Sequence, residues 1–230
     1  MELADSDSPQ PDLSMQRRLR SAAEVALGAA VVIGHNVYRV VPNEVLILLV
    51  VAILSFRLRD GRWLPDGLRR PESWRRIILI AIGAVVLRNV LGELVILPLG
   101  GRLWPQPEQL PEGADAITGN PGQALLALLL VWTFAAFGEE IVYRGYLLTR
   151  GAEVGGRSKG ALWVAAVVAS VLFGIGHYYK GPAGMIDSGV AGLIFGAAYL
   201  LAGRSLWACV LAHGLHDTLA VGWAFLGLEG

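Results

Sequence analysis

The chain has 230 residues, of which 54% are hydrophobic and only 17% charged, and its mean hydropathy is +0.54. Soluble domains of this length are far less apolar, so the composition indicates a polytopic membrane protein. Lysine and arginine together number 19, as do aspartate and glutamate, and a net charge of zero gives no indication of a nucleic-acid partner.

The first residues differ from everything that follows. Residues 1–20 begin with a polar, acidic stretch and end in three arginines, which predicts a disordered tail that is not a cleaved signal peptide. Residues 21–230 then form one helical membrane domain. Its single cysteine, Cys209, lies in an apolar run, cannot form an intrachain disulfide, and is expected to pack in the interior.

Seven apolar segments predict an all-α fold with about seven transmembrane helices. The second segment is short for a span, and His35, Asn36 and Arg39 interrupt the end of the first, so six spans with one interfacial helix is the alternative. The segments are 21–41, 43–57, 77–99, 122–149, 161–179, 186–203 and 205–227.

Basic residues are distributed unevenly between alternate connections. With the N-terminus in the cytoplasm, fourteen lysines and arginines fall on the inner side and three on the outer side. This bias predicts a cytoplasmic N-terminus, an external C-terminus and a cell or inner membrane location. The three outer residues are Arg39, Arg102 and Lys180.

The third span carries Arg88, Asn89 and Glu93 within an apolar context. Helical spacing places Asn89 and Glu93 on one face with Arg88 beside them. A structural polar cluster that faces other helices is favoured over a catalytic one.

The fourth span contains the sequence Phe137-Gly138-Glu139-Glu140-Ile141-Val142-Tyr143-Arg144-Gly145. Buried acids need charged partners or water, because an isolated charge in a membrane is costly. Glu140 and Arg144 are four residues apart and are expected to pair, whereas Glu139 lies about 100° around the helix. The spacing predicts a structural Glu140–Arg144 pair and a Glu139 that faces a cavity, the alternative being three interfacial charges.

Histidines occur at helical spacing in two later spans. Phe173 and His177 share a face of the fifth span, and His213 and Asp217 share a face of the seventh, with His216 on a neighbouring stripe. A His–Asp pair inside an apolar helix is difficult to explain by packing alone. Together with the two glutamates, these residues indicate a hydrolytic site built from three spans.

In order along the chain, these motifs resemble those of the CAAX protease and bacteriocin-processing (CPBP) family, which includes the type II CAAX prenyl endopeptidases. The family pattern is Glu-Glu-x-x-x-Arg, then Phe-x-x-x-His, then His-x-x-x-Asn or Asp, and the resemblance covers about residues 122–222. The prenyl-protein proteases of the family have Asn where this chain has Asp217. The resemblance implies an intramembrane endopeptidase that acts on a protein or peptide substrate within the lipid bilayer.

The resemblance also implies residue roles. Glu139 and His177 would activate water, His213 and Asp217 would stabilise the oxyanion, and Glu140 with Arg144 would support the site. Asp217 fits the oxyanion role only if protonated, because an ionised carboxylate donates no hydrogen bond, so it would otherwise orient His213 or bind metal. Glu139, His177, His213 and Asp217 also form a candidate zinc ligand set, although Glu-activated water requires no cofactor.

Two other functions fit the same residues. One is a proton- or ion-coupled transporter, although no inverted repeat or pair of broken helices is found in the sequence. The other is a non-catalytic scaffold or immunity protein. Counting residues from the helix ends places Glu139, His213 and Asp217 near mid-membrane but His177 nearer the outer side, so a shared site requires the fifth helix to start deep, tilt or break at Gly174 and Gly176.

Overall fold

The computed structural model describes residues 13–104 and 114–228. The predicted acidic tail lies outside these ranges as far as residue 12, and so does the central part of the loop at 100–121. The predicted tail boundary at residue 20 is wrong, since helix α1 already begins at Met15. Ser14 caps this helix by accepting a hydrogen bond from the backbone of Arg17, which satisfies one of the first amides.

The described residues are mostly helical and contain no strand, as predicted. Several helices run into one another, and π-helical turns interrupt two of the longest rods. In chain order the elements are α1 (Met15–Asn36), α2 (Glu44–Asp60), η1 (Asp66–Leu68), α3 (Trp74–Leu91), η2 (Gly92–Ile96), α4 (Leu97–Leu103), α5 (Ala114–Ile117), α6 (Pro121–Leu130), η3 (Val131–Glu139), η4 (Ile141–Leu148), α7 (Thr149–Val154), α8 (Lys159–Gly176), η5 (Tyr178–Lys180), α9 (Gly181–Leu201) and α10 (Leu206–Leu226).

Five helical stretches are long and apolar enough to cross a membrane: Trp74–Leu103, Pro121–Val154, Lys159–Gly176, Tyr178–Leu201 and Leu206–Leu226. All seven predicted segments form helices, but α1 and α2 are not among these five. Helix α2 has only 17 residues, and α1 carries arginines and a glutamate in its first half. The protein is therefore an all-α polytopic membrane protein in which the first two helices are the least typical spans.

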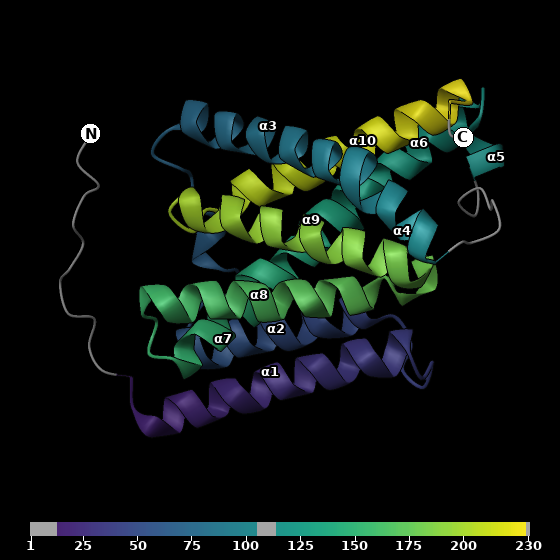
Figure 1. The fold of residues 1–230 in the computed structure, drawn as a ribbon. Coiled ribbons are helices and arrows are strands. Elements are labelled where there is room, and N and C mark those ends of the chain that lie inside the picture. Colours follow the sequence, from purple (N-terminus) through teal and green to yellow (C-terminus); the bar gives the residue numbers. More distant parts are fainter. Residues whose placement is uncertain (1–12, 105–113, 229–230) are drawn as a thin grey trace.

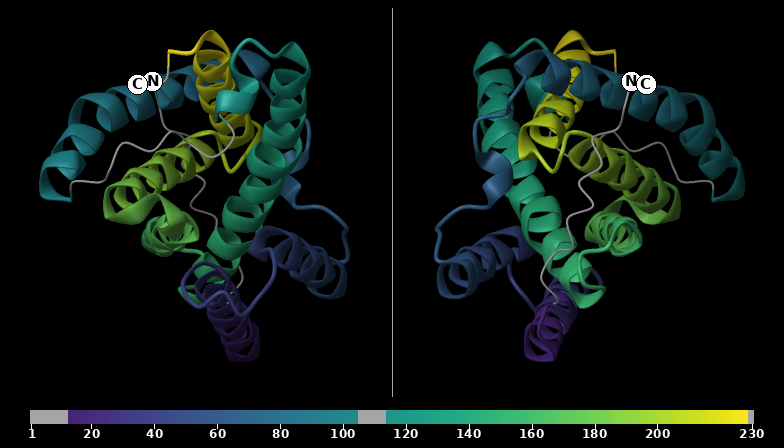
Figure 2. Two further views of the ribbon diagram at one scale, coloured as in Figure 1. Left: turned by 90° about the vertical axis from the view of Figure 1, so that its right-hand side faces the viewer. Right: turned by 90° about the vertical axis from the view of Figure 1, so that its left-hand side faces the viewer.

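The continuous helical stretch Pro121–Val154 carries Glu139 and Glu140 and is called the glutamate-bearing rod below. It joins two groups of helices (Figures 1 and 2). On one side it packs with α3, α8, α9 and α10, where Ala136, Leu148 and Ala152 enter the larger apolar cluster. On the other side Val142 and Tyr146 enter a second cluster with α1, α2 and α8. The glutamates thus lie on the element that both halves of the protein share.

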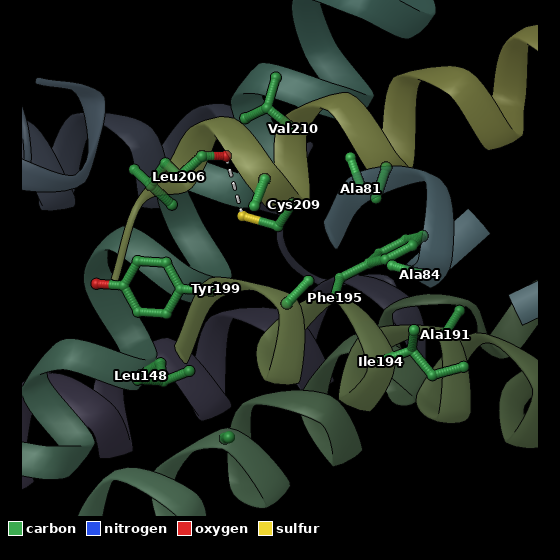
Figure 3. Packing of buried hydrophobic residues seen from close by; sticks show 14 of the residues in the cluster. Ala81, Ala84, Leu148, Ala191, Ile194, Phe195, Tyr199, Leu206, Cys209 and Val210 are labelled. Carbon is green, nitrogen blue, oxygen red and sulfur yellow. Dashed lines mark hydrogen bonds between the residues drawn. The ribbon is translucent and has the colours of Figure 1, made fainter. Parts of the chain in front are cut away.

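The larger cluster is built mainly from small residues (Figure 3). Cys209 lies fully buried within it and donates a hydrogen bond from its thiol to the carbonyl of Leu206 at 3.2 Å. Its predicted packing role is confirmed. Alanines from α3, η3, α7, α8, α9 and α10, including Ala84 and Ala191, allow the backbones to approach closely, which is the usual basis of helix association in membranes.

One end of the bundle contains a buried ionic network. Glu153 is completely buried and forms ion pairs with four arginines from three segments of the chain, Arg17, Arg59, Arg150 and Arg157. These residues belong to the set predicted to share the cytoplasmic side. The network therefore fixes the ends of α1, α2 and α7 together, while the orientation of this end in the membrane stays a prediction.

Candidate active site

Glu140 and Arg144 form the expected ion pair within the helix. Both side chains are almost completely buried, and the Arg144 Nη1 donates to Glu140 Oε1 at 2.7 Å. The helix is π-helical around them, which differs from the regular turn assumed from spacing. Such turns within α-helices are frequent at functional sites.

Arg144 also ties this rod to two neighbouring helices. Its Nη2 donates to the carbonyl of Gly192 on α9 at 2.7 Å. The guanidinium lies over the rings of Phe173 and Phe195, at 4.9 and 5.7 Å from their centroids. A buried guanidinium with a carboxylate, a carbonyl and two aromatic faces is fully compensated, so Arg144 acts as an anchor.

His213 lies between two carboxylates. Its Nδ1 is 2.9 Å from Glu140 Oε1, and its Nε2 is 3.4 Å from Asp217 Oδ2. The ring stacks on Phe195 with centroids 5.2 Å apart, and only 5% of the residue is exposed. An imidazole can donate to acceptors at both nitrogens only when it carries both protons, so this environment suits a positively charged His213.

His177 follows the last residue of α8. Its Nδ1 lies 2.8 Å from the carbonyl oxygen of Phe173. A carbonyl can only accept, so Nδ1 carries a proton and, in the neutral ring, Nε2 presents a lone pair. The centroid of the Phe173 ring lies 4.7 Å from that of the His177 ring and 5.9 Å from that of the His213 ring. Phe173 therefore packs against both histidines.

Glu139 differs from its neighbour because no hydrogen bond or ion pair joins it to any of the described residues. It is half-buried, and its Oε2 is shielded from solvent without any hydrogen bond. Within the described ranges no hydrogen bond joins Glu139 to His177. An unpaired, shielded carboxylate oxygen requires a further partner, such as a water molecule or a substrate group.

Helix α8 reaches the site without a break. It runs continuously from Lys159 to Gly176, so the expected alternative of a break at its glycines is wrong. These glycines instead permit close contacts, since a Cβ at Gly174 would lie 2.7 Å from the Met185 carbonyl oxygen, and one at Gly176 would lie 2.9 Å from the Tyr143 hydroxyl. Tyr143 is four residues after Glu139, so this contact brings the end of α8 against the glutamate-bearing rod.

The polar residues of the third span face other helices. Arg88 pairs with Asp187 of α9 at 2.5 Å, and His216 Nδ1 lies 3.0 Å from the Asn89 side-chain oxygen. Glu93 is exposed, so it does not take part in these buried contacts. The π-helical turn that begins at Gly92 changes the direction of the residues that follow.

Two contacts of the site had no signal in the sequence: the stacking of Phe195 and the carbonyl of Gly192. The sixth apolar segment contains no motif, and a backbone carbonyl leaves no trace in a sequence. Tyr143 could have been found, because it follows Glu139 by four residues and therefore shares its face.

The candidate zinc ligands do not fit a metal centre. Within the described part of the chain, no three or more His, Cys, Asp or Glu side chains are arranged to hold an ion. Both ring nitrogens of His213 face carboxylates, and Nδ1 of His177 donates to a carbonyl. A zinc ligand must offer a nitrogen lone pair, so only Nε2 of His177 is available for one.

Comparison with known families bears on these residues directly. Residues 121–219 match the family model described as type II CAAX prenyl endopeptidase Rce1-like. This part of the chain is similar to the Rce1-like family. All three motifs lie inside the matched segment, so the recognised family is confirmed. No curated protein and no solved structure matches the chain.

The segment that matches the Rce1-like model consists of α6 to the middle of α10. It therefore includes the glutamate-bearing rod, His177, and His213 with Asp217. Membership supports protease activity on membrane-associated protein substrates. Helices α1 to α5 lie outside the match and supply part of the packing around it.

Proposed function

We propose that this protein is an intramembrane endopeptidase that hydrolyses peptide bonds of membrane-associated or lipidated proteins with water activated by Glu139 and His177. The observation that carries the proposal is the contrast between the two adjacent glutamates. Glu140 is held through its Oε1 by Arg144 and His213 and only its Oε2 lacks a hydrogen bond, while neither oxygen of Glu139 has a hydrogen-bond partner among the described residues. A general base needs such an unoccupied acceptor.

In the proposed reaction, Glu139 takes a proton from a water molecule as the water oxygen attacks the peptide carbonyl carbon. His177 Nε2 accepts a hydrogen bond from the same water and orients it. The carbonyl π electrons move to the oxygen and form an oxyanion. Collapse of this intermediate breaks the carbon–nitrogen bond, and the proton held by Glu139 passes to the leaving amine.

His213 supports this reaction as the donor to the oxyanion. Its Nδ1 is fixed by Glu140, whereas the 3.4 Å contact of Nε2 with Asp217 is long for a hydrogen bond. The Nε2–H is therefore the donor that is free to turn toward a developing negative charge. Donors of this kind are effective in a site from which water is excluded.

We also propose that the N-terminus is cytoplasmic and that the substrate enters from the cytoplasmic half of the bilayer, and the arginine-rich end of the bundle supports this orientation. Lipidated proteins are the proposed substrates because the matched family is described by CAAX prenyl endopeptidases. The prenyl-protein proteases have an asparagine where this chain has Asp217. An aspartate is compatible with this proposal, because its contact with His213 positions the imidazole ring.

The test compares protein termini in membranes of cells that produce wild-type protein, Glu139→Gln or the matched control Glu93→Gln, an exposed glutamate outside the site. We expect new termini with the wild type and with Glu93→Gln but not with Glu139→Gln. Cleavage by Glu139→Gln at the wild-type rate would refute the proposal. A change of ion flux in proteoliposomes without any cleavage would favour the transporter instead.

A further inference from the structure

A cavity lies at the arginine-rich end of the protein, and neither Glu139 nor Glu140 lines it. Its volume is about 300 Å³, and it is bordered by the loop after α2, by η4 and α7, and by the ends of α9. Three arginines line it, Arg62, Arg157 and Arg204, together with the hydroxyl-bearing residues Thr149 and Tyr199. These five residues define what we call the basic pocket.

Two of the arginines reach the pocket from unusual turns. Arg157 follows α7 and Arg204 follows α9, and each adopts a positive φ, 60° and 67°, directly after a glycine with φ of 70°. Left-handed backbone is unfavourable for a residue with a Cβ, so two such arginines at one cavity are unexpected. Conformations of this kind concentrate at functional sites, where the surrounding structure maintains them.

Two acids, Asp60 and Asp66, also line this cavity, and both are paired with arginines. Asp60 pairs with Arg17 at 2.9 Å and with Arg150 at 2.7 Å, and Asp66 pairs with Arg62 and Arg69. Glu153 is shared among four arginines, one of which is Arg157.

Arg204 has no carboxylate partner among the residues that the structure describes, and it is exposed. The side chains of Arg62 and Arg157 are also partly exposed. The pocket therefore carries excess positive charge with guanidinium groups that can reach a ligand.

The surroundings of the basic pocket are those of a membrane interface. Trp63, next to Arg62, is 64% exposed and stacks with the guanidinium of Arg57, and Leu58 is 81% exposed. Exposed tryptophan beside arginine is typical of the headgroup region of a bilayer. A separate cavity of about 420 Å³ lies along α7 and α8. Small and apolar residues line it, including Val154 and Val164, and they are close in sequence to Arg157 of the basic pocket.

We propose that the basic pocket binds a phosphate group, and that the headgroup of an anionic phospholipid supplies it. Guanidinium groups from three different segments converge there, and each can donate two hydrogen bonds to phosphate oxygens. Basic pockets between membrane helices bind anionic headgroups by this chemistry. Such a lipid would join the loop after α2 to the turns that follow α7 and α9.

The test measures phospholipid binding to the purified full-length protein. Wild type, Arg204→Gln and the double variant Arg157→Gln/Arg204→Gln are delipidated and titrated with phosphatidylglycerol, with phosphatidylcholine and with inorganic phosphate, with native mass spectrometry and thermal unfolding as readouts. Arg70→Gln/Arg75→Gln is the matched control, because both arginines are exposed at the same end and neither lines the pocket. Arg204→Gln breaks no ion pair, so it tests the pocket even if the double variant fails to fold.

We expect phosphatidylglycerol to bind the wild type and the control variant equally. Arg204→Gln should weaken this binding about fivefold and the double variant about 30-fold, following the contribution of each arginine near a membrane surface. If inorganic phosphate alone stabilises the protein with the same dependence on Arg204, the phosphate site holds and its source is soluble. Unchanged phosphatidylglycerol and phosphate binding in both variants would overturn the proposal.

Discussion

Glu140 meets His213 across the interior of the protein, with its Oε1 only 2.9 Å from the histidine Nδ1. The same oxygen accepts the hydrogen bond of Arg144. This shared oxygen connects the first motif of the family to the third and holds the Glu140 carboxylate in an ion pair with Arg144. The two neighbouring glutamates therefore have different surroundings, and substitutions at the two positions should fail in different ways.

The first prediction concerns this difference. Glu139→Gln should lower the cleavage rate by about 10²–10⁴-fold, the usual contribution of a general base, with no loss of stability. Glu140→Gln should destabilise the protein by about 3–5 kcal/mol, because Arg144 would keep a buried charge without its carboxylate. Cleavage assays and unfolding in detergent measure the two effects separately. Equal losses of stability in both variants would contradict the assignment.

The second prediction concerns Asp217. Its contact with His213 Nε2 is 3.4 Å long, and an asparagine oxygen could occupy the same place. Asp217→Asn should therefore retain cleavage within about tenfold, whereas Asp217→Ala should lose about 10²-fold because His213 is no longer positioned. Rates on one peptide substrate decide between these outcomes. An inactive Asp217→Asn would show that the negative charge itself is required.

The sequence predicted the elements of this site better than their geometry. Acids and histidines in apolar spans are costly, so Glu139, Glu140, His177 and His213 stood out from their surroundings. The pairing of Glu140 with Arg144 followed from helical spacing alone. Both features depend only on residue type and on spacing along one helix, so they can be predicted without the tertiary packing.

The remaining features depend on packing between distant segments. The π-helical turns around Glu139 and after Gly92 change which residues share a face, and a regular 3.6-residue period cannot predict them. Glu93 lies within the second of these turns and is exposed, which the spacing alone does not predict. The ring of Phe195 meets His213 only because α9 and α10 pack together, and nothing local distinguishes that phenylalanine from others.

The third prediction concerns the pair that joins α3 to α9. Arg88 and Asp187 are both buried and lie 2.5 Å apart. Arg88→Met should destabilise the protein by about 3–5 kcal/mol, since it strands Asp187 as an unpaired buried charge. Arg88→Met/Asp187→Leu should recover most of this loss, because replacing both members of a buried pair is often neutral. A double-mutant cycle of unfolding free energies measures the coupling, and additive losses would contradict it.

The fourth prediction concerns metal. Both nitrogens of His213 face carboxylates, so the residues of the site do not offer zinc a complete ligand set. Protein dialysed against a chelator should therefore keep its cleavage rate, and added zinc should not increase it. Metal content of the purified protein, measured alongside activity, provides the control. Activity that is lost with the chelator and restored by zinc would contradict the Glu-activated mechanism.

The fifth prediction concerns the contact that brings α8 to the glutamate-bearing rod. A Cβ at position 176 would lie 2.9 Å from the Tyr143 hydroxyl, closer than van der Waals contact allows. Gly176→Ala should therefore displace His177, the next residue, and lower cleavage by about 10²-fold. Tyr143→Phe removes the clashing oxygen, so Gly176→Ala/Tyr143→Phe should regain most of the lost rate. Gly160→Ala is the matched control, because no atom lies within 4 Å of a Cβ there. If the double variant is no faster than Gly176→Ala, the contact between Gly176 and Tyr143 does not set the position of His177.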